Sequence, residues 1–220
     1  MSNVVSFNGV DGQVIVVGAA SLLLTTEFTI IMRFKVIQKY QFQTYLLNRN
    51  NYYGLLYGYT TTYTGYRNTV EFFLAGYAGD DLRVLSGINI PDTGWHHVAY
   101  AYSNTGTSWK GFLDAQRIFS LVKTTTLSAA AGNMAIGSGG TGNYNNCMIS
   151  EMQIYNRQLS DDEIKQNYEH PGNPIRRGLV LNLTQESIYG TQWNDLSGNA
   201  NNGTYVNGAL PTRANLVTQR

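Results

Sequence analysis

Two adjacent histidines, His96 and His97, are the residue types in this sequence best suited to general acid or base chemistry. They lie in the segment 95–102, where aromatic and β-branched residues alternate with the period of a strand. Successive strand residues point to opposite faces, so the two imidazoles cannot act on one substrate. No nucleophile motif stands near them. We therefore predict that both are packing and hydrogen-bonding residues of a central strand.

A crowded set of tyrosine, asparagine and arginine residues offers the chemistry of a binding surface. Sugars stack on aromatic faces while amide and charged groups bind the hydroxyls, and aromatic rings also anchor protein interfaces. The alternative is a sheet surface that is rich in tyrosine because tyrosine favours strands. The Gly- and Asn-rich loop 137–146 adds further candidates, since binding sites are common on loops; it lacks the ending of a phosphate-binding loop. The predicted ligand contacts are Arg49, Asn51, Tyr53, Tyr57, Tyr59, Tyr63 and Tyr66, with Asn143, Tyr144 and Asn145 from this loop.

Composition narrows the class of protein. The 220 residues suffice for one large β domain with a sizeable core. Only 13% of residues are charged and the net charge is +1, so we expect no nucleic-acid partner. The apolar run 14–24 is too short to cross a bilayer, and residues 1–3 lead into a strand without a signal peptide. Cys147 is predicted to be a semi-buried thiol, the alternative being an intersubunit disulfide.

Short strand candidates follow one another closely, separated by Asn, Gly and Asp turns. In residues 28–37, apolar side chains occupy one face and mixed side chains the other, which predicts a half-buried strand. Many short strands at this spacing predict an all-β fold, an antiparallel sandwich or jelly roll. The clearest candidates are residues 12–17, 28–37, 45–49, 53–59, 69–75 and 82–88.

One short helix is predicted near residues 160–169. Ser160 is a suitable N-cap, and Glu163 completes a capping box. Asp161 and Asp162 favour the positive end of the helix dipole. A metal site at this acidic group is the alternative to helix capping. The helix should end before His170-Pro171-Gly172.

Several segments in order carry a resemblance to a known family. The string GWHHVAYAYS at 94–103 is followed by KGFLDAQRI at 110–118, and residues 5–12, 134–139 and 149–160 complete the series. Together they resemble a laminin-G-like domain of the concanavalin A-like lectin/glucanase superfamily, over most of residues 4–170. Ala115 stands where that family usually has Gly. The resemblance implies a concanavalin A-like antiparallel β-sandwich, which is a stronger statement about fold than about function.

The resemblance also implies what chemistry to look for. Laminarinase-like relatives carry catalytic acids as Glu-x-Asp-x-Glu on one strand, whereas the comparable strand here has Glu151 alone. Glu71 also stands alone, and Asp80-Asp81 suit a turn, so we expect no enzyme. The family often holds one calcium ion at the sheet rim, and a structural calcium would be bound here through Asp11 and Glu151. No other cofactor is expected.

Residues 178–210 resemble the family's first strand and its Asp-Ser-Ser-Gly-Asn turn, which normally precede the segment seen here at residues 5–12. Three interpretations stay open. The chain 1–220 is one circularly permuted sandwich with its core in 1–170, and 178–210 pairs with the N-terminal strand. Alternatively, 178–210 is donated to a neighbouring subunit, or it begins a second domain.

These features favour a non-enzymatic, lectin-like recognition or structural module on an exterior surface. Our first hypothesis is a virion structural protein (capsid, turret or tail) that binds glycan, located on a virion or an extracellular surface. The alternative is a carbohydrate-binding accessory domain of a secreted or cell-surface protein, and a glycoside hydrolase is the least favoured. We expect a glycan or protein surface as partner, a homo-oligomer or larger assembly, and no membrane insertion.

Overall fold

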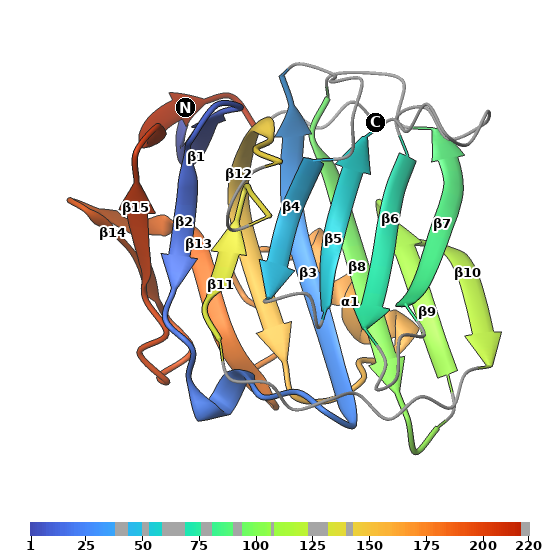
Figure 1. Ribbon diagram of the computed structural model, residues 1–220. Helices are drawn as coiled ribbons and strands as arrows, with labels where there is room; N and C mark the ends of the chain where they lie inside the picture. Colours follow the sequence, from blue (N-terminus) through green and yellow to red (C-terminus); the bar gives the residue numbers. More distant parts are fainter. Residues whose placement is uncertain are drawn as a thin grey trace.

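The computed structural model describes residues 1–37, 44–49, 53–58, 69–75, 81–89, 94–106, 108–122, 132–139 and 143–216. Within these ranges, sixteen strands form one continuous antiparallel sheet that folds into two layers, as the sequence predicts (Figure 1). The back layer runs through β10 (Gln116–Val122), β9 (Ser108–Leu113), β8 (His96–Ser103), β3 (Glu27–Val36), β12 (Asn146–Tyr155) and β13 (Leu179–Tyr189). The front layer runs through β2 (Gln13–Val16), β11 (Met134–Ile136), β4 (Thr44–Arg49), β5 (Tyr53–Gly58), β6 (Thr69–Ala75) and β7 (Asp81–Asn89).

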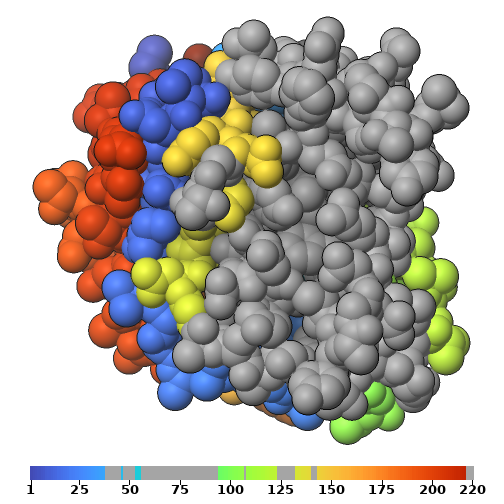
Figure 2. Space-filling model, viewed as in Figure 1, coloured from blue at the N-terminus to red at the C-terminus, as the bar shows by residue number. Residues whose placement is uncertain are grey.

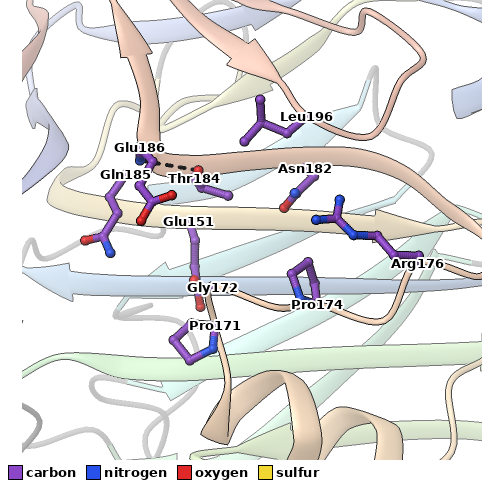
Figure 3. A pocket seen from close by; sticks show the side chains of 10 residues that line it. All are labelled: Glu151, Pro171, Gly172, Pro174, Arg176, Asn182, Thr184, Gln185, Glu186 and Leu196. Carbon is purple, nitrogen blue, oxygen red and sulfur yellow. Dashed lines mark hydrogen bonds between the residues drawn. The ribbon is translucent and has the colours of Figure 1, made fainter.

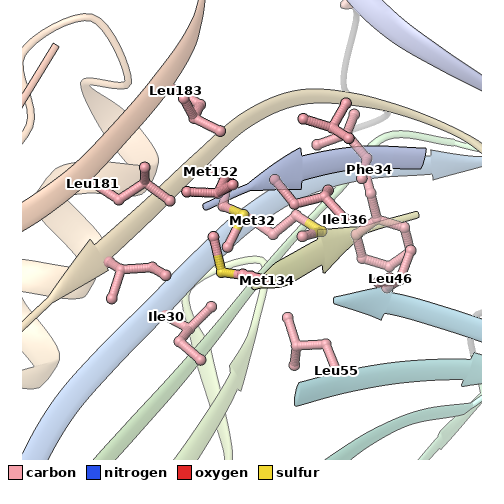
Figure 4. Packing of buried hydrophobic residues seen from close by; sticks show 14 of the residues in the cluster. Ile30, Met32, Phe34, Leu46, Leu55, Met134, Ile136, Met152, Leu181 and Leu183 are labelled. Carbon is pink, nitrogen blue, oxygen red and sulfur yellow. The ribbon is translucent and has the colours of Figure 1, made fainter. Parts of the chain in front are cut away.

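Alternation along the back strands divides them between two cores. Val98, Tyr100 and Tyr102 of β8 enter the main core between the layers, whereas Ala99 and Ala101 face the opposite side. The aliphatic and methionine side chains of the main core interlock between β3, β12 and the front strands (Figure 4). The faces agree with the predicted period of two, and the large residues fill the space between the sheets.

The outer face of the back layer is also covered, which corrects the prediction of a half-buried strand at residues 28–37. Helix α1 (Asp161–Glu169) lies behind this layer (Figure 1). Its Ile164 packs in a second core with Ile31, Phe112 and Tyr155 from the strands. Thr29 and Ile31 on the outer face of β3 are therefore buried, because the helix and the residues leading into it cover them, whereas Arg33 and Lys35 on the same face stay half-buried.

Helix α1 begins as the sequence predicts. The Ser160 hydroxyl accepts a hydrogen bond from the Glu163 backbone N–H, and the Glu163 carboxylate accepts one from the Ser160 backbone N–H. Glu163 also receives two hydrogen bonds from the Arg157 guanidinium, at 2.7 and 2.8 Å. Asp161 binds Lys110 and Arg117 of the back sheet, so the first turn is attached to the strands beneath it.

The C-terminal segment pairs within its own chain. β13 lies antiparallel to β12, and β14 (Gln192–Asp195) and β15 (Gly203–Val206) link it to β2 of the front layer. β16 (Ala209–Ala214) pairs with β1 (Ser2–Asn8), which also pairs with β12. The first and last strands, β1 and β16, accordingly lie side by side on one flank of the molecule (Figure 2).

Cys147 is free and fully buried in the main core, and burial raises the pKa of its thiol far above the usual range. A short 3-10 turn occupies Ala20–Leu22. Among the described residues, no helix has the length and apolar character that a membrane span requires.

We predict that removing residues 174–220 unfolds the domain. Without β13–β16, part of β12 and one edge each of β1 and β2 lose their partners, and unpaired edges are costly to leave exposed. Circular dichroism should show no cooperative thermal transition for a chain ending at Asn173, while the full chain melts cooperatively. A truncated chain that is soluble, monomeric and cooperatively folded would contradict the intrachain pairing.

A second prediction concerns the β9–β10 hairpin, whose two-residue turn is Asp114-Ala115. Ala115 has φ +63°, a left-handed conformation that favours Gly. Ala115→Gly should therefore raise the free energy of unfolding by about 0.5–1 kcal/mol, after the entropic cost of Gly in the unfolded chain. Urea unfolding measures this change. Ala214→Gly, at a strand position, is the control and should lower the free energy of unfolding. If both variants lose stability, the left-handed conformation of Ala115 is not strained.

Candidate functional site

The candidate site lies where two strands separate beside β12. Residues 146–149 of β12 pair with β1, whereas residues 152–155 pair with β13. Glu151 stands at this junction, and its side chain extends toward the loop that follows α1 (Figure 3). It faces a pocket of about 120 Å³. The pocket is lined by Glu151, Pro171, Gly172, Pro174, Arg176, Asn182, Thr184, Gln185, Glu186 and Leu196.

A buried hydrogen-bond network fixes the loop wall of the pocket. Asn167 of α1 donates from Nδ2 to the Tyr155 hydroxyl at 2.9 Å. The Asn167 Oδ1 accepts from the backbone N–H of Ile175 at 2.9 Å. The Tyr155 hydroxyl in turn donates to Gln153 Oε1 at 3.2 Å. Loop 171–175 is thus tied through the helix to the outer face of β12.

A bulge in β13 forms the opposite wall. Its register against β14 moves from Leu183–Asp195 to Ile188–Trp193, so β13 carries three extra residues there. The Ser187 hydroxyl donates to the Thr184 carbonyl at 3.0 Å and accepts from the Thr184 N–H at 3.1 Å. The Trp193 indole N–H also donates to this carbonyl, at 2.7 Å. The bulge places Gln185 and Glu186 beside the pocket instead of in the ladder.

Asp195 organises the third side. Its Oδ1 accepts from the backbone N–H of Asn182 and of Ser197, and its Oδ2 accepts from the Ser197 hydroxyl and the Asn201 N–H. This ionisable group is therefore occupied in holding the turn 195–201. Asn182 and Leu196 keep their positions in the pocket through backbone hydrogen bonds at this turn.

Burial dominates the electrostatics of Glu151. Only 7% of the residue is exposed, and desolvation raises the pKa of its carboxyl to about 7, although the cross-strand neighbour Arg33 acts to lower it. Two further oxygens in the pocket, Asn182 Oδ1 and Gln185 Oε1, are buried and accept no hydrogen bond from the described part of the chain. The pocket therefore holds buried acceptors that find no partner among the residues the structure describes.

The histidines face opposite ways, as the sequence predicts. His96 Nδ1 lies 2.9 Å from Asp114 Oδ2, and its ring packs near Phe34 on the main-core side. His97 is buried against the edge of Tyr168 of α1, with ring centroids 5.3 Å apart. Burial lowers the pKa of His97 to about 4. The His97 imidazole is thus neutral near pH 7, and neither ring faces the pocket lining.

The predicted ligand contacts are divided by the structure. Tyr53 is 2% exposed, packs on Phe28 and donates to the Leu22 carbonyl at 3.4 Å, so it is a core residue with no face left for a ligand. Asn145 is also fully buried, below the loop that exposes Asn143 and half-buries Tyr144. The other predicted contacts fall outside what the structure describes. These are the residues Asn51, Tyr59, Tyr63 and Tyr66, and the side chains of Arg49 and Tyr57.

The two predicted calcium ligands lie apart. Asp11 follows β1, whose last residue Asn8 pairs with Asn146, and Glu151 is five residues further along β12, roughly 16 Å at the rise of a strand. Asn8 Nδ2 donates to Asp11 Oδ1 at 2.7 Å within a tight turn. Asp11 and Glu151 therefore cannot ligate one ion. In the part of the chain that the structure describes, no three His, Cys, Asp or Glu side chains gather as a metal site.

Sequence reasoning found Glu151 but missed the residues around it. Arg176, Asn182, Gln185 and Glu186 reach the pocket only because loop 171–175 and the β13 bulge bring them there. The available signal was Thr184-Gln185-Glu186-Ser187, a polar interruption with local hydrogen-bonding residues inside a predicted strand.

A family model described as the concanavalin A-like lectin/glucanases superfamily matches residues 8–165. The chain belongs to this superfamily. No curated protein matches it in sequence. The fold is shared with a protein from Bacteroides ovatus named as a candidate carbohydrate binding protein, with a TM-score of 0.73 and 17% identity, over 96% of this chain and 60% of that one.

Two further solved structures share the superfamily fold. The heptameric SAP-like pentraxin from Limulus polyphemus has a TM-score of 0.69 and 16% identity, over 98% of this chain and 96% of that one. The botulinum neurotoxin DC binding domain, solved with SialylT, has a TM-score of 0.56 and 13% identity, over 71% of this chain and 39% of that one. This chain thus spans less than two thirds of the Bacteroides chain and well under half of the toxin chain. At these identities, the likeness shows the fold alone.

The burial of Glu151 predicts a pH-dependent stability. The pKa of Glu151 is about 7 in the folded state, compared with an ordinary value of 4.5 in the unfolded state. Between these pH values the folded state binds more protons, so the stability of the protein falls as pH rises from about 4.5 to about 7. Glu151→Gln should be more stable than the parent at about pH 8, by on the order of 3 kcal/mol at most, and similar near pH 5. Urea unfolding at both pH values measures this.

The control for this prediction is Glu169→Gln, an exposed residue of α1 outside the pocket. It should change stability little at either pH. The pKa of His97 is lowered in the folded state, so this residue makes the parent and the Glu151→Gln variant equally less stable as pH falls below about 6.5. The effect of His97 therefore cancels when the two proteins are compared at the same pH. An equal stability of Glu151→Gln and the parent at about pH 8 would contradict a buried, costly carboxylate.

Proposed function

We propose that this chain is a non-catalytic recognition module that binds carbohydrate in the pocket at Glu151. One observation carries the proposal: two buried oxygens of β13 that have no partner among the described residues open into the same polar pocket as the buried carboxyl of Glu151 on β12. Sugars supply hydroxyl donors, and the prolines and Leu196 offer apolar surface to the ring carbons. The candidate carbohydrate binding protein from Bacteroides ovatus and the toxin domain solved with SialylT support this ligand class through the shared fold.

A hydrolytic role is the second candidate, because Glu186 lines the same pocket as Glu151. A protonated acid and an ionised carboxylate on either side of a glycosidic bond are what hydrolysis requires. Glu186, however, sits on the rim in the bulge, and the small pocket suits one sugar unit better than a bond between two. Recognition without cleavage is therefore the function that this geometry favours.

The biological setting extends the proposal. An exterior surface suits a glycan-binding module, and a virion component stays our first hypothesis for it, with an accessory domain of a secreted protein as the alternative. Assembly into a homo-oligomer is part of the same proposal, and the pentraxin of similar fold is heptameric. Light scattering on the full chain tests it, since a monomer at all concentrations would remove the assembly role.

We predict that the labelled full chain binds defined members of a glycan array near pH 8. The double substitution Asn182→Ala/Gln185→Ala should weaken this binding about tenfold or more, because two acceptors are lost. Gln166→Ala, exposed on α1, is the matched control and should bind like the parent. Soluble glycans that bind are then checked for release of reducing sugar.

The outcomes separate the alternatives. Binding without release, weakened by the pocket variant alone, supports the recognition module. Release of reducing sugar that Glu186→Gln abolishes would replace it with a hydrolase. No bound glycan would overturn the carbohydrate function, and binding that the pocket variant leaves unchanged would move the site elsewhere on the molecule.

A further inference from the structure

The buried lining atoms that have no partner among the described residues are acceptor oxygens. None of the described residues donates a hydrogen bond to the Glu151 carboxylate. Only 7% of this residue is exposed to solvent. Asn182 Oδ1 and Gln185 Oε1 are buried without a partner on the facing wall. A ligand that only accepts hydrogen bonds would leave these oxygens unpaired, which costs on the order of 1–3 kcal/mol for each group. The pocket therefore selects a donor.

The charges around Glu151 decide what kind of donor fits. Arg33 on β3 is the cross-strand neighbour, and Arg176 comes from the loop after α1. Glu186 on the β13 bulge is the second acid, and the adjoining hollow at the chain's N-terminus adds Arg213 of β16. The guanidinium groups of these arginines balance the carboxylates of Glu151 and Glu186. A cationic ligand therefore gains no net electrostatic attraction in the pocket. A neutral donor is favoured.

The rest of the two linings adds one further charge, the N-terminal ammonium of Met1 in the adjoining hollow. The lining contributed after α1 is Pro171, Gly172 and Pro174, and β1 contributes Ser2 and Asn3 to the adjoining hollow. On β8, the residue beyond Arg33 is His97, which burial keeps neutral. Within the lining of the pocket itself, Glu151 is the group whose pKa is raised to about 7, so its charge changes near neutral pH.

We propose that the pocket binds a neutral group donating paired hydrogen bonds, in a sugar two neighbouring hydroxyls, and that it does so only while Glu151 is ionised. This inference rests on the proposed carbohydrate function and adds the binding chemistry and its control by protons. An ionised carboxylate accepts from both hydroxyls, whereas a protonated carboxyl gives up one acceptor and places a donor against the ligand. Binding therefore strengthens as pH rises.

The expected size follows from linkage. If only the ionised form binds, a carboxyl pKa of about 7 makes binding about 30-fold weaker near pH 5.5 than near pH 8. Binding must reciprocally release a proton below neutral pH, because the ligand holds Glu151 ionised. A site contacted only by uncharged side chains would show neither effect.

The experiment follows the side-chain amide signals of Asn182 and Gln185 by nitrogen-15 NMR in the full chain. D-mannose, D-galactose and myo-inositol are the neutral probes, and methylammonium chloride is the cationic probe. Each is titrated near pH 5.5 and near pH 8 at equal ionic strength. We expect at least one neutral probe to shift both amide signals near pH 8, with binding about 30-fold weaker near pH 5.5.

Two variants give the comparison. Glu151→Gln keeps the shape of the side chain but removes its charge, and it should bind about tenfold or more weakly near pH 8 and lose the pH dependence. Glu169→Gln makes the same change on the exposed face of α1 and should behave like the parent. Folding of each variant is checked by its backbone spectrum.

Each contrary result has a distinct meaning. Equal binding at both pH values, unchanged binding by Glu151→Gln, or tighter binding of methylammonium than of any neutral probe overturns this inference. A neutral sugar that shifts other residues but not the pocket amides overturns it while leaving the carbohydrate function standing. Absence of binding by every probe and every arrayed glycan overturns both.

Discussion

The exchange of partners along β12 is the constraint on which the rest of the structure depends. One edge of this strand pairs with β3 over nearly its full length, but the other edge is shared between β1 and β13. The strands from both ends of the chain must therefore meet at β12, and β16 and β15 complete the pairing on either side. Glu151 occupies the junction, where neither partner strand continues the ladder.

That junction explains why a carboxyl can be both buried and accessible. Strands on either side exclude water, while the gap between them leaves space that loop 171–175 and the β13 bulge enclose without filling. Desolvating a carboxylate without a hydrogen bond is costly, and the raised pKa of Glu151 expresses that cost. The energetics of this group suit a site whose ligand completes the hydrogen bonds.

Much of the fold could be predicted because its signals are local. The period of two across 95–102 correctly assigned the faces of β8, and Ser160 with Glu163 correctly placed the start of α1. The cover that α1 gives to the outer face of β3 was missed, because strand periodicity reports the polarity of a face and not which element lies over it. Tyr53 was misplaced for a related reason, since tyrosine serves equally in a core and on a surface.

The sequence by itself determined the superfamily, the two-layer antiparallel sheet and the capped helix at residues 161–169. It also determined that Glu151 lacks the paired acids of a Glu-x-Asp-x-Glu strand. Each of these features depends on residues that are close together in the sequence. Only the tertiary structure decided the site. Arg176 comes from the loop before β13, and Asn182 and Gln185 come from β13 and its bulge, whereas Glu151 lies on β12, on the other side of helix α1 in the sequence. Their shared pocket arises from long-range pairing and the register shift of β13, and it is this arrangement in space that sets the pKa and the unpaired acceptors.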